Sequence, residues 1–233
     1  MILAIPSKGR LMEATLDWFA RRGLAVGRSG TDREYAAAAD MDGLSVQMLS
    51  ASEIAGALAE GRVHLGVTGS DLVREGWADH AARFETLAAM GFGQADLVVA
   101  VPAFWTDCRD LHDLDEVAAQ MRAATGQRLR VATKYHRLVR EHFRAAGVAD
   151  YVLVDSQGAT EGAIANGTAD AVADITSTGE TLRQNHLRML EDPPIHRSEA
   201  TLFRAARADW DDAARAALAR LRDRLGLAGP AGT

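Results

Sequence analysis

One stretch of the sequence decides the fold: Ala171-Val172-Ala173-Asp174-Ile175-Thr176-Ser177-Thr178-Gly179-Glu180-Thr181-Leu182. It begins as a short apolar run that includes an acidic residue near its end, which is typical of a buried strand. It continues as a turn of glycine and small hydroxyl residues and then as the start of a helix. Strand–turn–helix units of this kind build α/β folds with mostly parallel sheets, so the stretch predicts that class.

The same alternation of apolar runs and amphipathic stretches extends along the rest of the chain. Ser50 and Glu53 form a capping box that predicts a helix start, and Gly147 predicts a helix end. A second series of strand–helix units begins near Met90, which predicts two α/β lobes with a central cleft for a small ligand. We expect strands at residues 2–5, 44–49, 63–67, 95–101, 129–132, 151–154, 171–175 and 200–203, and helices at 9–22, 50–60, 114–124, 136–146, 161–165 and 209–225, with another from residue 71.

Composition and charge exclude several classes of partner. The 233 residues carry 26 Lys and Arg against 32 Asp and Glu, a net charge of −6, so the chain lacks the broad positive field that holds nucleic acid. We expect anions to be bound locally instead. The single cysteine, Cys108, excludes an internal disulfide and a cysteine-based zinc site, and no His or Cys cluster has metal-ligand spacing. With no signal segment and no apolar run of membrane-spanning length, the chain is expected to be cytoplasmic.

The turn after Asp174 has the composition of a phosphate-binding loop. Its backbone N–H groups can converge on one point at a helix start, and Ser177, Thr178 and Thr181 add hydroxyl donors there. Asp174 can accept hydrogen bonds from the vicinal hydroxyls of a sugar, so together these residues predict a site for a ribose 5-phosphate group. The alternative is a strand-to-helix turn in which the hydroxyls serve only as caps.

Polar residues follow four other predicted strands, and each group opens a predicted helix. Because parallel strands bring their carboxyl ends to one edge, such corners lie where open α/β sheets bind ligands. The cations among them can bind phosphates or stay solvated, Asp71 can cap its helix or face a ligand, and Glu161 places a carboxylate near a helix start. The four corners are Ser7-Lys8-Gly9-Arg10, Gly69-Ser70-Asp71, Thr133-Lys134-Tyr135-His136-Arg137 and Gln157-Gly158-Ala159-Thr160-Glu161.

At these corners the chain resembles the ATP phosphoribosyltransferase family, across residues 1 to about 203. The order and spacing of the motifs together carry the resemblance. The motifs are Pro6-Ser7-Lys8-Gly9-Arg10-Leu11, Gly66-Val67-Thr68-Gly69-Ser70-Asp71, Arg130-Val131-Ala132-Thr133-Lys134-Tyr135 and Asp174-Ile175-Thr176-Ser177-Thr178-Gly179-Glu180-Thr181-Leu182.

The resemblance implies a two-lobed fold like that of the type II periplasmic binding proteins, in which the chain crosses between lobes twice. We therefore expect lobe I at residues 1–91 and 187–233, and lobe II, with the phosphoribosyl-binding loop, at 92–186. The resemblance also implies a reaction in which N1 of the ATP adenine attacks C1 of phosphoribosyl pyrophosphate. Pyrophosphate leaves with inversion, Mg²⁺ accompanies the diphosphate, and phosphoribosyl-ATP forms in the first step of histidine biosynthesis.

The resemblance further implies roles for individual residues. Positive charge develops on the ribose and negative charge on pyrophosphate, so Lys8 and Arg10 are expected at the leaving group with Mg²⁺. Asp174 and Glu161 are expected to hold the ribose hydroxyls. We expect no general base, because adenine N1 already has a lone pair and positioning supplies most of the rate. Other substrate contacts are expected from Ser7, Gly9, Gly69, Ser70, Asp71, Lys134, Thr176, Ser177, Thr178, Gly179 and Thr181.

Two positions and the length of the chain depart from the commonest family pattern. Many members carry an arginine and an aspartate–proline pair where this chain has residues 49–54, and a proline where it has His136. Long members add a C-terminal regulatory domain, so the resemblance implies a short-form catalytic subunit here. Such subunits form a hetero-octamer with a regulatory protein resembling a histidyl-tRNA synthetase, with feedback by histidine.

Two other functions fit the same residues. A small-metabolite binding module of the same fold would use the lobes without catalysis, and another phosphoribosyltransferase would use the phosphate loop with a different base. The sequence contains no Walker P-loop, no G-x-G-x-x-G after a strand and no G-x-S-x-G elbow, which argues against the corresponding nucleotide and hydrolase sites. Pyrophosphate release with different acceptors separates the remaining three functions.

Overall fold

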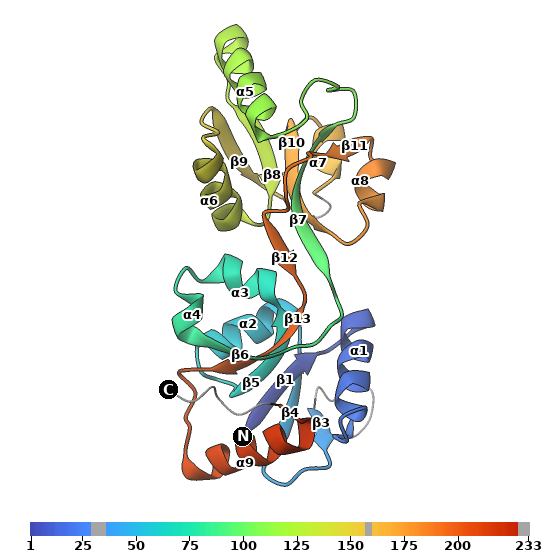
Figure 1. Cartoon of the computed structure of the whole chain (residues 1–233), viewed down its shortest axis with the longest axis vertical. Coiled ribbons are helices and arrows are strands. Elements are labelled where there is room, and N and C mark those ends of the chain that lie inside the picture. The colour runs from blue at the N-terminus through green and yellow to red at the C-terminus, as the bar shows by residue number, and fades with distance from the viewer. Residues whose placement is uncertain (29–35, 157–159, 228–233) are drawn as a thin grey trace. The chain divides into compact units, whose positions relative to one another are not determined.

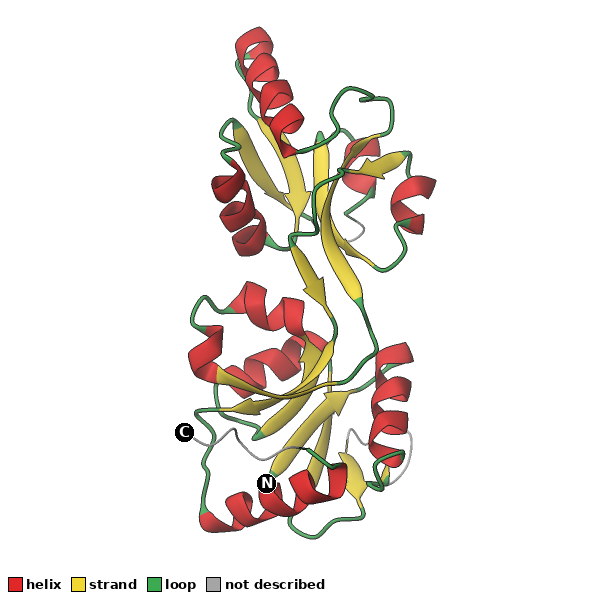
Figure 2. Ribbon diagram, viewed as in Figure 1, coloured by secondary structure: helices red, strands yellow, loops and turns green. Residues whose placement is uncertain are grey.

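The computed structural model describes residues 1–28, 36–156 and 160–227, which form two compact units. Unit 1 comprises Met1–Gly93 and Glu199–Thr233, and unit 2 comprises Gln94–Ser198. Each unit has its own sheet, helices and hydrophobic core (Figure 1, Figure 2). The predicted α/β class with two lobes is therefore confirmed.

Unit 1 is built on one seven-stranded sheet. Its elements are β1 (Ile2–Pro6), α1 (Gly9–Ala20), β2 (Val26–Arg28), β3 (Ala36–Ala39), β4 (Ser45–Leu49), α2 (Ala51–Ala59), β5 (Leu65–Gly69), α3 (Ser70–Gly76), α4 (His80–Arg83), β6 (Phe84–Ala89), β13 (Ala200–Ala205) and α9 (Asp212–Leu225). The strand order is β2-β3-β4-β1-β5-β13-β6. β1 runs parallel to β4 and β5, so these three strands bring their carboxyl ends to the same edge, whereas the other pairs are antiparallel.

The core of unit 1 forms where helices cover this sheet with apolar side chains. Leu3 and Ile5 of β1, Phe19 of α1 and Leu58 of α2 are fully buried in one cluster. Helix α9, red in Figure 1, adds Leu221 to the same cluster. Each such side chain contributes about 1.5–3 kcal/mol when fully buried, so the cluster holds in place the strands that end at the polar corners.

A glycine in β5 sets how closely α2 approaches the sheet. A Cβ atom at Gly66 would lie 2.6 Å from Cγ2 of Ile54 and 2.9 Å from Cδ1 of Leu58. Well-packed carbon atoms do not come so close, so a larger residue at this position would displace the helix. The missing side chain lets α2 pack directly on the strand.

Unit 2 is built on a six-stranded sheet. Its elements are β7 (Ala95–Pro102), α5 (Leu111–Thr125), β8 (Leu129–Thr133), α6 (His136–Ala146), β9 (Tyr151–Asp155), α7 (Gly162–Ala165), β10 (Ala171–Thr176), α8 (Glu180–Gln184), β11 (Leu187–Met189) and β12 (His196–Ser198). The strand order is β11-β7-β10-β8-β9, and β12 pairs with β7 beside this path. β8, β9 and β10 are parallel, whereas β7 is antiparallel to β10, β11 and β12.

The second passage of the chain between the units lies later in the sequence than expected. We expected lobe II to end at residue 186, but residues 187–198 belong to unit 2. The physical reason is strand pairing: in β11 Arg188 lies opposite Val101 of β7, and in β12 Arg197 lies opposite Asp96. The first passage lies at Gly93 and Gln94, close to the expected residues 91 and 92.

Local signals at the helix ends act as the sequence predicts. The Ser50 side chain accepts a hydrogen bond from the Glu53 amide at 3.3 Å, and Glu53 accepts one from the Ser50 amide at 2.9 Å, so the capping box is confirmed. Hydrogen bonds from Ser50 lower the pKa of Glu53. Gly147 ends α6 in the left-handed conformation with φ of 83°. Helix α9 begins at Asp212 and not at the expected residue 209. The reason is that the Asp211 carboxylate caps the helix by accepting a hydrogen bond from the Ala214 amide at 2.6 Å.

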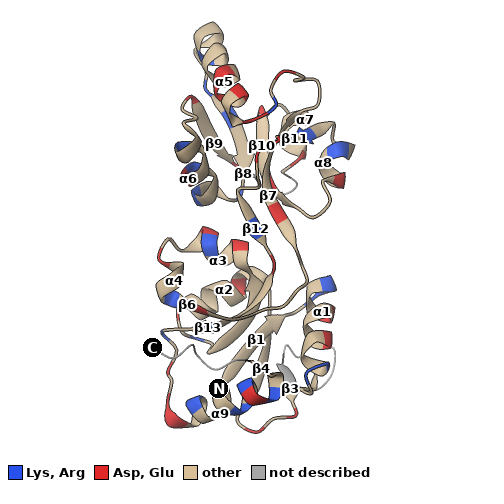
Figure 3. Cartoon of the chain, in the orientation of Figure 1, with Lys and Arg blue, Asp and Glu red and all other residues tan. Residues whose placement is uncertain are grey.

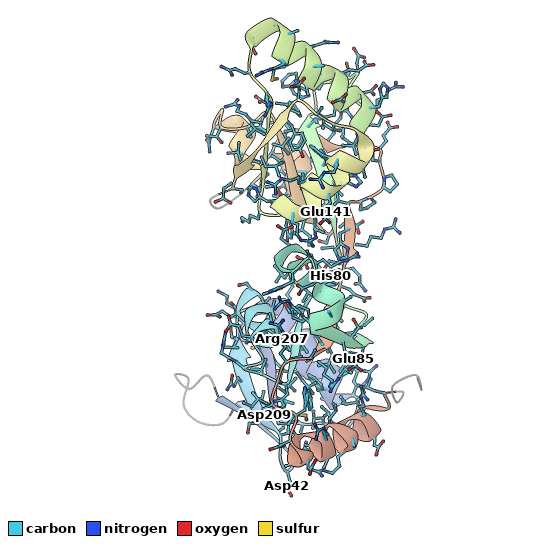
Figure 4. All side chains as sticks on the ribbon, turned by 90° about the vertical axis from the view of Figure 1, so that its left-hand side faces the viewer. Asp42, His80, Glu85, Glu141, Arg207 and Asp209 are labelled. Atoms are coloured by element: carbon cyan, nitrogen blue, oxygen red, sulfur yellow. The ribbon has the colours of Figure 1, made fainter. Side chains whose placement is uncertain are left out.

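Arginines tie neighbouring elements together by ion pairs in both units. In unit 1, Glu85, labelled in Figure 4, accepts from Arg204 of β13 at 2.6 Å and from Arg222 of α9 at 2.9 Å. In unit 2, Asp170 accepts from Nη2 of Arg130 at 2.8 Å and from its Nε at 3.1 Å. Burial of Asp170 disfavours its charge, but the hydrogen bonds and charge of Arg130 outweigh that effect and lower the pKa of Asp170.

Replacing Gly66 with alanine should destabilise unit 1, because the new methyl group would collide with Ile54 and Leu58. Overpacking of this kind costs about 1–3 kcal/mol, measured as a lower urea midpoint. Gly56→Ala in α2 is the matched control, since nothing lies within 4 Å of a Cβ there. Alanine inside a helix is favoured over glycine by about 1 kcal/mol, so this control should raise the midpoint. Equal midpoints for the two variants would contradict the close approach.

Asp170→Asn should lower stability at neutral pH, and its difference from wild type should shrink on acidification. The folded-state pKa of Asp170 is lowered below the unfolded value of about 3.9. Its ionised form therefore stabilises the fold above that pH, and this contribution is lost as the pH falls through the folded-state pKa. Urea unfolding at a series of pH values from about 3 to 7 measures the effect. A difference that stays constant over this range would rule out the ion pair as its cause.

Candidate active site

The carboxyl ends of three parallel strands meet at one edge of the unit 2 sheet. Thr133, at the end of β8, lies opposite Ala173 of β10 and opposite Asp155 of β9. Lys134 and Asp174, which directly follow Thr133 and Ala173, therefore lie at the same edge, as the strands in Figure 1 show. Open α/β sheets bind ligands at such an edge, so the geometry favours a site here.

The loop after β10 is closed by its own hydroxyl groups. The amide of Gly179 donates to Oγ1 of Thr176 at 2.8 Å, and the amide of Glu180 donates to Oγ1 of Thr178 at 3.3 Å. Gly179 has φ of 69°, a left-handed conformation that favours glycine. Ser177 and Thr178 are exposed, and their amides donate to no other residue that the structure describes. The loop thus offers fewer open amides than the sequence suggested, because its threonines already bind two of them.

Asp174 lies at the base of this loop, opposite Val98 of β7. It is half-buried, and its Oδ1 accepts a hydrogen bond from the amide of Ile175 at 2.8 Å. Within the described ranges, its Oδ2 has no hydrogen-bond partner. One carboxylate oxygen is therefore fixed by the backbone while the other can accept a hydrogen bond from a ligand hydroxyl.

A second corner of unit 2 follows β9. The hydroxyls of Ser156 and Thr160 lie 2.7 Å apart and are buried, and the Ser156 amide donates to the carbonyl of Thr133 at 3.2 Å. Glu161 stands before α7, and its side chain makes no capping hydrogen bond, so the helix does not use its carboxylate. The rest of the expected corner, Gln157-Gly158-Ala159, lies outside the described residues.

In unit 1, the turn from β1 to α1 lies at the edge where β1, β4 and β5 end. The amide of Ser7 donates to the carbonyl of Leu49 at 2.9 Å, which fixes this turn beside the end of β4. Gly9 begins α1 with φ of 70°. Lys8 and Arg10 are exposed, and Figure 3 colours part of this start of α1 blue for Lys or Arg. Two accessible cations at the carboxyl end of a strand can bind an anion.

In the turn after β5, the residue at the N-cap position is Gly69 and not Asp71. Helix α3 begins at Ser70 and its N-cap is Gly69, without a side-chain cap. Asp71 therefore lies in the first turn of the helix and not at the N-cap position, and it is buried at 6% exposure. The Ser70 amide donates to the carbonyl of Glu199 at 3.1 Å, which ties this turn to the start of β13.

Other kinds of site gain no support from residues 1–28, 36–156 and 160–227. No group of three or more His, Cys, Asp or Glu among them is placed to hold a metal ion. None of their helices combines the length and the apolar character needed to cross a bilayer. Burial raises the pKa of Cys108 to about 11, so at neutral pH it is a thiol and a poor nucleophile.

The predicted site residues thus fall into two groups, one in each unit. That the two groups act together stays a prediction. Unit 1 holds Ser7, Lys8, Gly9, Arg10, Gly69, Ser70 and Asp71, and unit 2 holds Lys134, Glu161, Asp174, Thr176, Ser177, Thr178, Gly179 and Thr181.

Comparison with known proteins decides the family. The HisG family model, described as ATP phosphoribosyltransferase, matches residues 50–226. A relative from Cereibacter sphaeroides named ATP phosphoribosyltransferase is 59% identical over 226 residues, which cover 97% of this chain and 95% of that protein. This chain belongs to the ATP phosphoribosyltransferase family.

Two further ATP phosphoribosyltransferases show how lengths vary among these relatives. The protein from Mesorhizobium japonicum is 51% identical over 208 residues, covering 88% of this chain and 90% of the relative. The protein from Rhodopseudomonas palustris (strain BisA53) is 51% identical over 215 residues, covering 92% of this chain but 66% of the relative.

Solved structures show the same fold at low identity. The ATP phosphoribosyl transferase (HisG:HisZ) complex from Thermotoga maritima matches with a TM-score of 0.71 at 20% identity, covering 97% of this chain and 96% of that one. The L-cystine solute receptor of Neisseria gonorrhoeae matches with a TM-score of 0.51 at 11% identity, covering 97% and 85%. The periplasmic-binding-protein-like fold expected from the sequence is therefore confirmed for this ATP phosphoribosyltransferase family member.

Two side chains beside the loop after β10 were not singled out from the sequence. A Cβ at Gly179 would lie 3.1 Å from Cε of Met189 and 3.3 Å from Nη1 of Arg183. Arg183 follows Gly179 by four residues, so helical spacing was an available signal for it. Met189 reaches the loop through the pairing of β11 with β7, which has no signal in the sequence.

Proposed function

We propose that this chain condenses ATP with phosphoribosyl pyrophosphate, in the cytoplasm, as the first step of histidine biosynthesis. Adenine N1 forms a bond to C1 of the ribose, the bond from C1 to the pyrophosphate oxygen breaks, and phosphoribosyl-ATP and pyrophosphate result. The observation that carries the proposal is the hydroxyl-rich loop 174–181 at the carboxyl edge of a parallel sheet, in a member of the ATP phosphoribosyltransferase family.

Unit 2 binds the phosphoribosyl group in this proposal. Asp174 and Glu161 accept hydrogen bonds from the ribose hydroxyls, each through carboxylate oxygens that no helix cap uses. The 5-phosphate is held by the open amides of Ser177 and Thr178 and by the hydroxyls of residues 176–181, with Lys134 as a further phosphate contact. Fixing both the phosphate and the hydroxyls orients C1 for in-line attack, which is the main source of rate in a reaction without a general base.

Unit 1 supplies the groups that act on the pyrophosphate and on ATP. Lys8 and Arg10, both exposed at the start of α1, neutralise the negative charge that develops on the leaving group. Ser7 and Gly9 belong to the same turn. Gly69 and Ser70, with Asp71 in the first turn of α3, provide further substrate contacts, but the Ser70 amide itself is already bonded to the carbonyl of Glu199.

Mg²⁺ would be bound mainly through the diphosphate of the substrate. The cations Lys8 and Arg10 suit diphosphate oxygens rather than a bare metal ion, and the described residues include no cluster of three metal-ligating side chains. Mg²⁺ keeps several waters and is commonly bound through one or two carboxylates plus substrate phosphates. The donor set therefore fits a metal carried by the substrate, where it would stabilise the departing pyrophosphate.

A separate regulatory subunit resembling a histidyl-tRNA synthetase is the partner that we propose, in a hetero-octamer with feedback by histidine. Its support is the likeness in fold to the Thermotoga maritima chain, which was solved in a HisG:HisZ complex. The chain also covers 95% of its Cereibacter sphaeroides relative, so the two have similar lengths.

The proposed reaction is tested by pyrophosphate release from phosphoribosyl pyrophosphate and Mg²⁺, with ATP or another base, with and without the regulatory subunit. We expect release only with ATP. Release with another base but not with ATP would identify a different phosphoribosyltransferase. No turnover under any condition, together with tight binding of a small metabolite, would identify a binding module instead.

Variants of the loop and of α1 test the residue roles. Asp174→Ala and Thr178→Val should each raise the KM for phosphoribosyl pyrophosphate or lower kcat by about tenfold, the usual effect of losing a hydrogen bond to a charged group. Lys8→Glu should impair pyrophosphate use in both reaction directions. Thr106→Val is the matched control, because Thr106 is an exposed threonine of unit 2 outside both groups. Wild-type kinetics in all three site variants, with unchanged unfolding curves, would refute the assignment.

A further inference from the structure

The short helix after the phosphate loop turns an arginine back toward the loop. Nη1 of Arg183 lies 3.3 Å from the point where a Cβ of Gly179 would stand. Met189 covers the same glycine, with its Cε atom at 3.1 Å and its Sδ atom at 3.5 Å from that point. Gly179 is accordingly buried although Ser177 and Thr178 beside it are exposed. The guanidinium group therefore lies against the loop backbone.

A carboxylate on the same helix holds this guanidinium group. Nη2 of Arg183 donates to Oε2 of Glu180 at 2.8 Å, and Gln184 donates to Oε1 of Glu180 at 3.0 Å. The hydrogen bonds from Arg183 and Gln184 lower the pKa of Glu180, so it stays ionised at neutral pH. Among the residues that the structure describes, Nη1 and Nε of Arg183 have no hydrogen-bond partner. One side of the guanidinium is thus fixed and the other is available to a ligand.

Lys134 is one cation already assigned to this phosphate, and the negative charges around the loop favour a second one. A phosphate monoester carries up to two negative charges, and the loop itself contributes only dipoles together with the carboxylates of Asp174 and Glu180. Two carboxylates beside a dianion are unfavourable unless a positive charge balances them. Arg183 neutralises Glu180 and brings N–H donors to the same place. A guanidinium fork matches phosphate oxygens better than an ammonium group does.

We propose that Arg183 is a binding residue for the 5-phosphate of the phosphoribosyl group, with Glu180 as its positioning residue. This inference rests on the proposed function and adds a cation to the phosphate site of that reaction. The contrary view is that Arg183 and Glu180 form only an i,i+3 ion pair on an exposed helix, which contributes little to stability and nothing to phosphate binding. The two views differ in what they expect of phosphate binding.

The test measures binding of ribose 5-phosphate and, separately, of inorganic pyrophosphate to the whole chain by titration calorimetry. For Arg183→Gln we expect the Kd of ribose 5-phosphate to rise by about tenfold or more, as for other charge-assisted hydrogen bonds. The Kd of pyrophosphate should change less than about twofold, since that ligand is assigned to Lys8 and Arg10. Arg183→Lys should recover part of the loss, and Glu180→Gln should show a smaller loss.

Arg144→Gln is the matched control, because Arg144 is an exposed arginine of α6 in the same unit with no ion pair to a described residue. It should bind both ligands as the wild type does. Wild-type binding of ribose 5-phosphate by Arg183→Gln, or equal losses for ribose 5-phosphate and pyrophosphate, would overturn the inference. Failure of wild-type turnover with ATP would refute the proposed reaction instead, and the ribose 5-phosphate titrations would still decide the role of Arg183.

Discussion

Parallel strand pairing is the constraint on which the candidate site depends. In unit 2, Thr133 of β8 is opposite both Ala173 of β10 and Asp155 of β9, so three chain segments end at one edge. A slip of one residue in this register would turn Asp174 to the other face of the sheet. Val131 and Ala132 pack into two different core clusters, so such a slip would exchange side chains between two closely packed cores. Burial in the core therefore determines where the polar residues lie.

The same constraint explains how an acidic chain can bind anions. Its net charge of −6 gives no general attraction, so binding must come from groups placed at short range. In the loop after β10, the hydroxyls of Thr176 and Thr178 hold the backbone in its turn by hydrogen bonds within the loop itself. A loop that is already ordered loses less conformational entropy when it binds. Arg183 and Glu180 extend this order to a charged group.

Sequence patterns predicted the elements that carry strong local signals. The capping box at Ser50 and the glycine stop at Gly147 depend on residues within one helical turn, and both are present. The strands β11 and β12 were missed because each has three residues and exists through pairing with β7. Strands β2, β3 and β6, which lie at or near the edges of the unit 1 sheet, were also missed.

Within the candidate site, the sequence suggested a chemistry, which stays a prediction, but it did not reveal the contacts inside the loop. The composition of the loop indicated a phosphate, but its internal hydrogen bonds from Gly179 and Glu180 follow from backbone geometry that composition does not encode. The approach of Met189 to Gly179 depends on two segments joined through the sheet, which no local pattern reveals. Family membership rests on identity along the whole chain and complements this local reasoning.

The close packing at Gly66 restricts which residues can be substituted at three positions during evolution. Because Ile54 and Leu58 fill the space that a side chain at position 66 would need, the three residues share one fixed volume. A relative that gained a side chain at 66 would have to shorten the residue at 54 or 58 to keep the helix against the strand. Substitutions at these positions are therefore expected to occur together, although none of the three is among the expected substrate contacts.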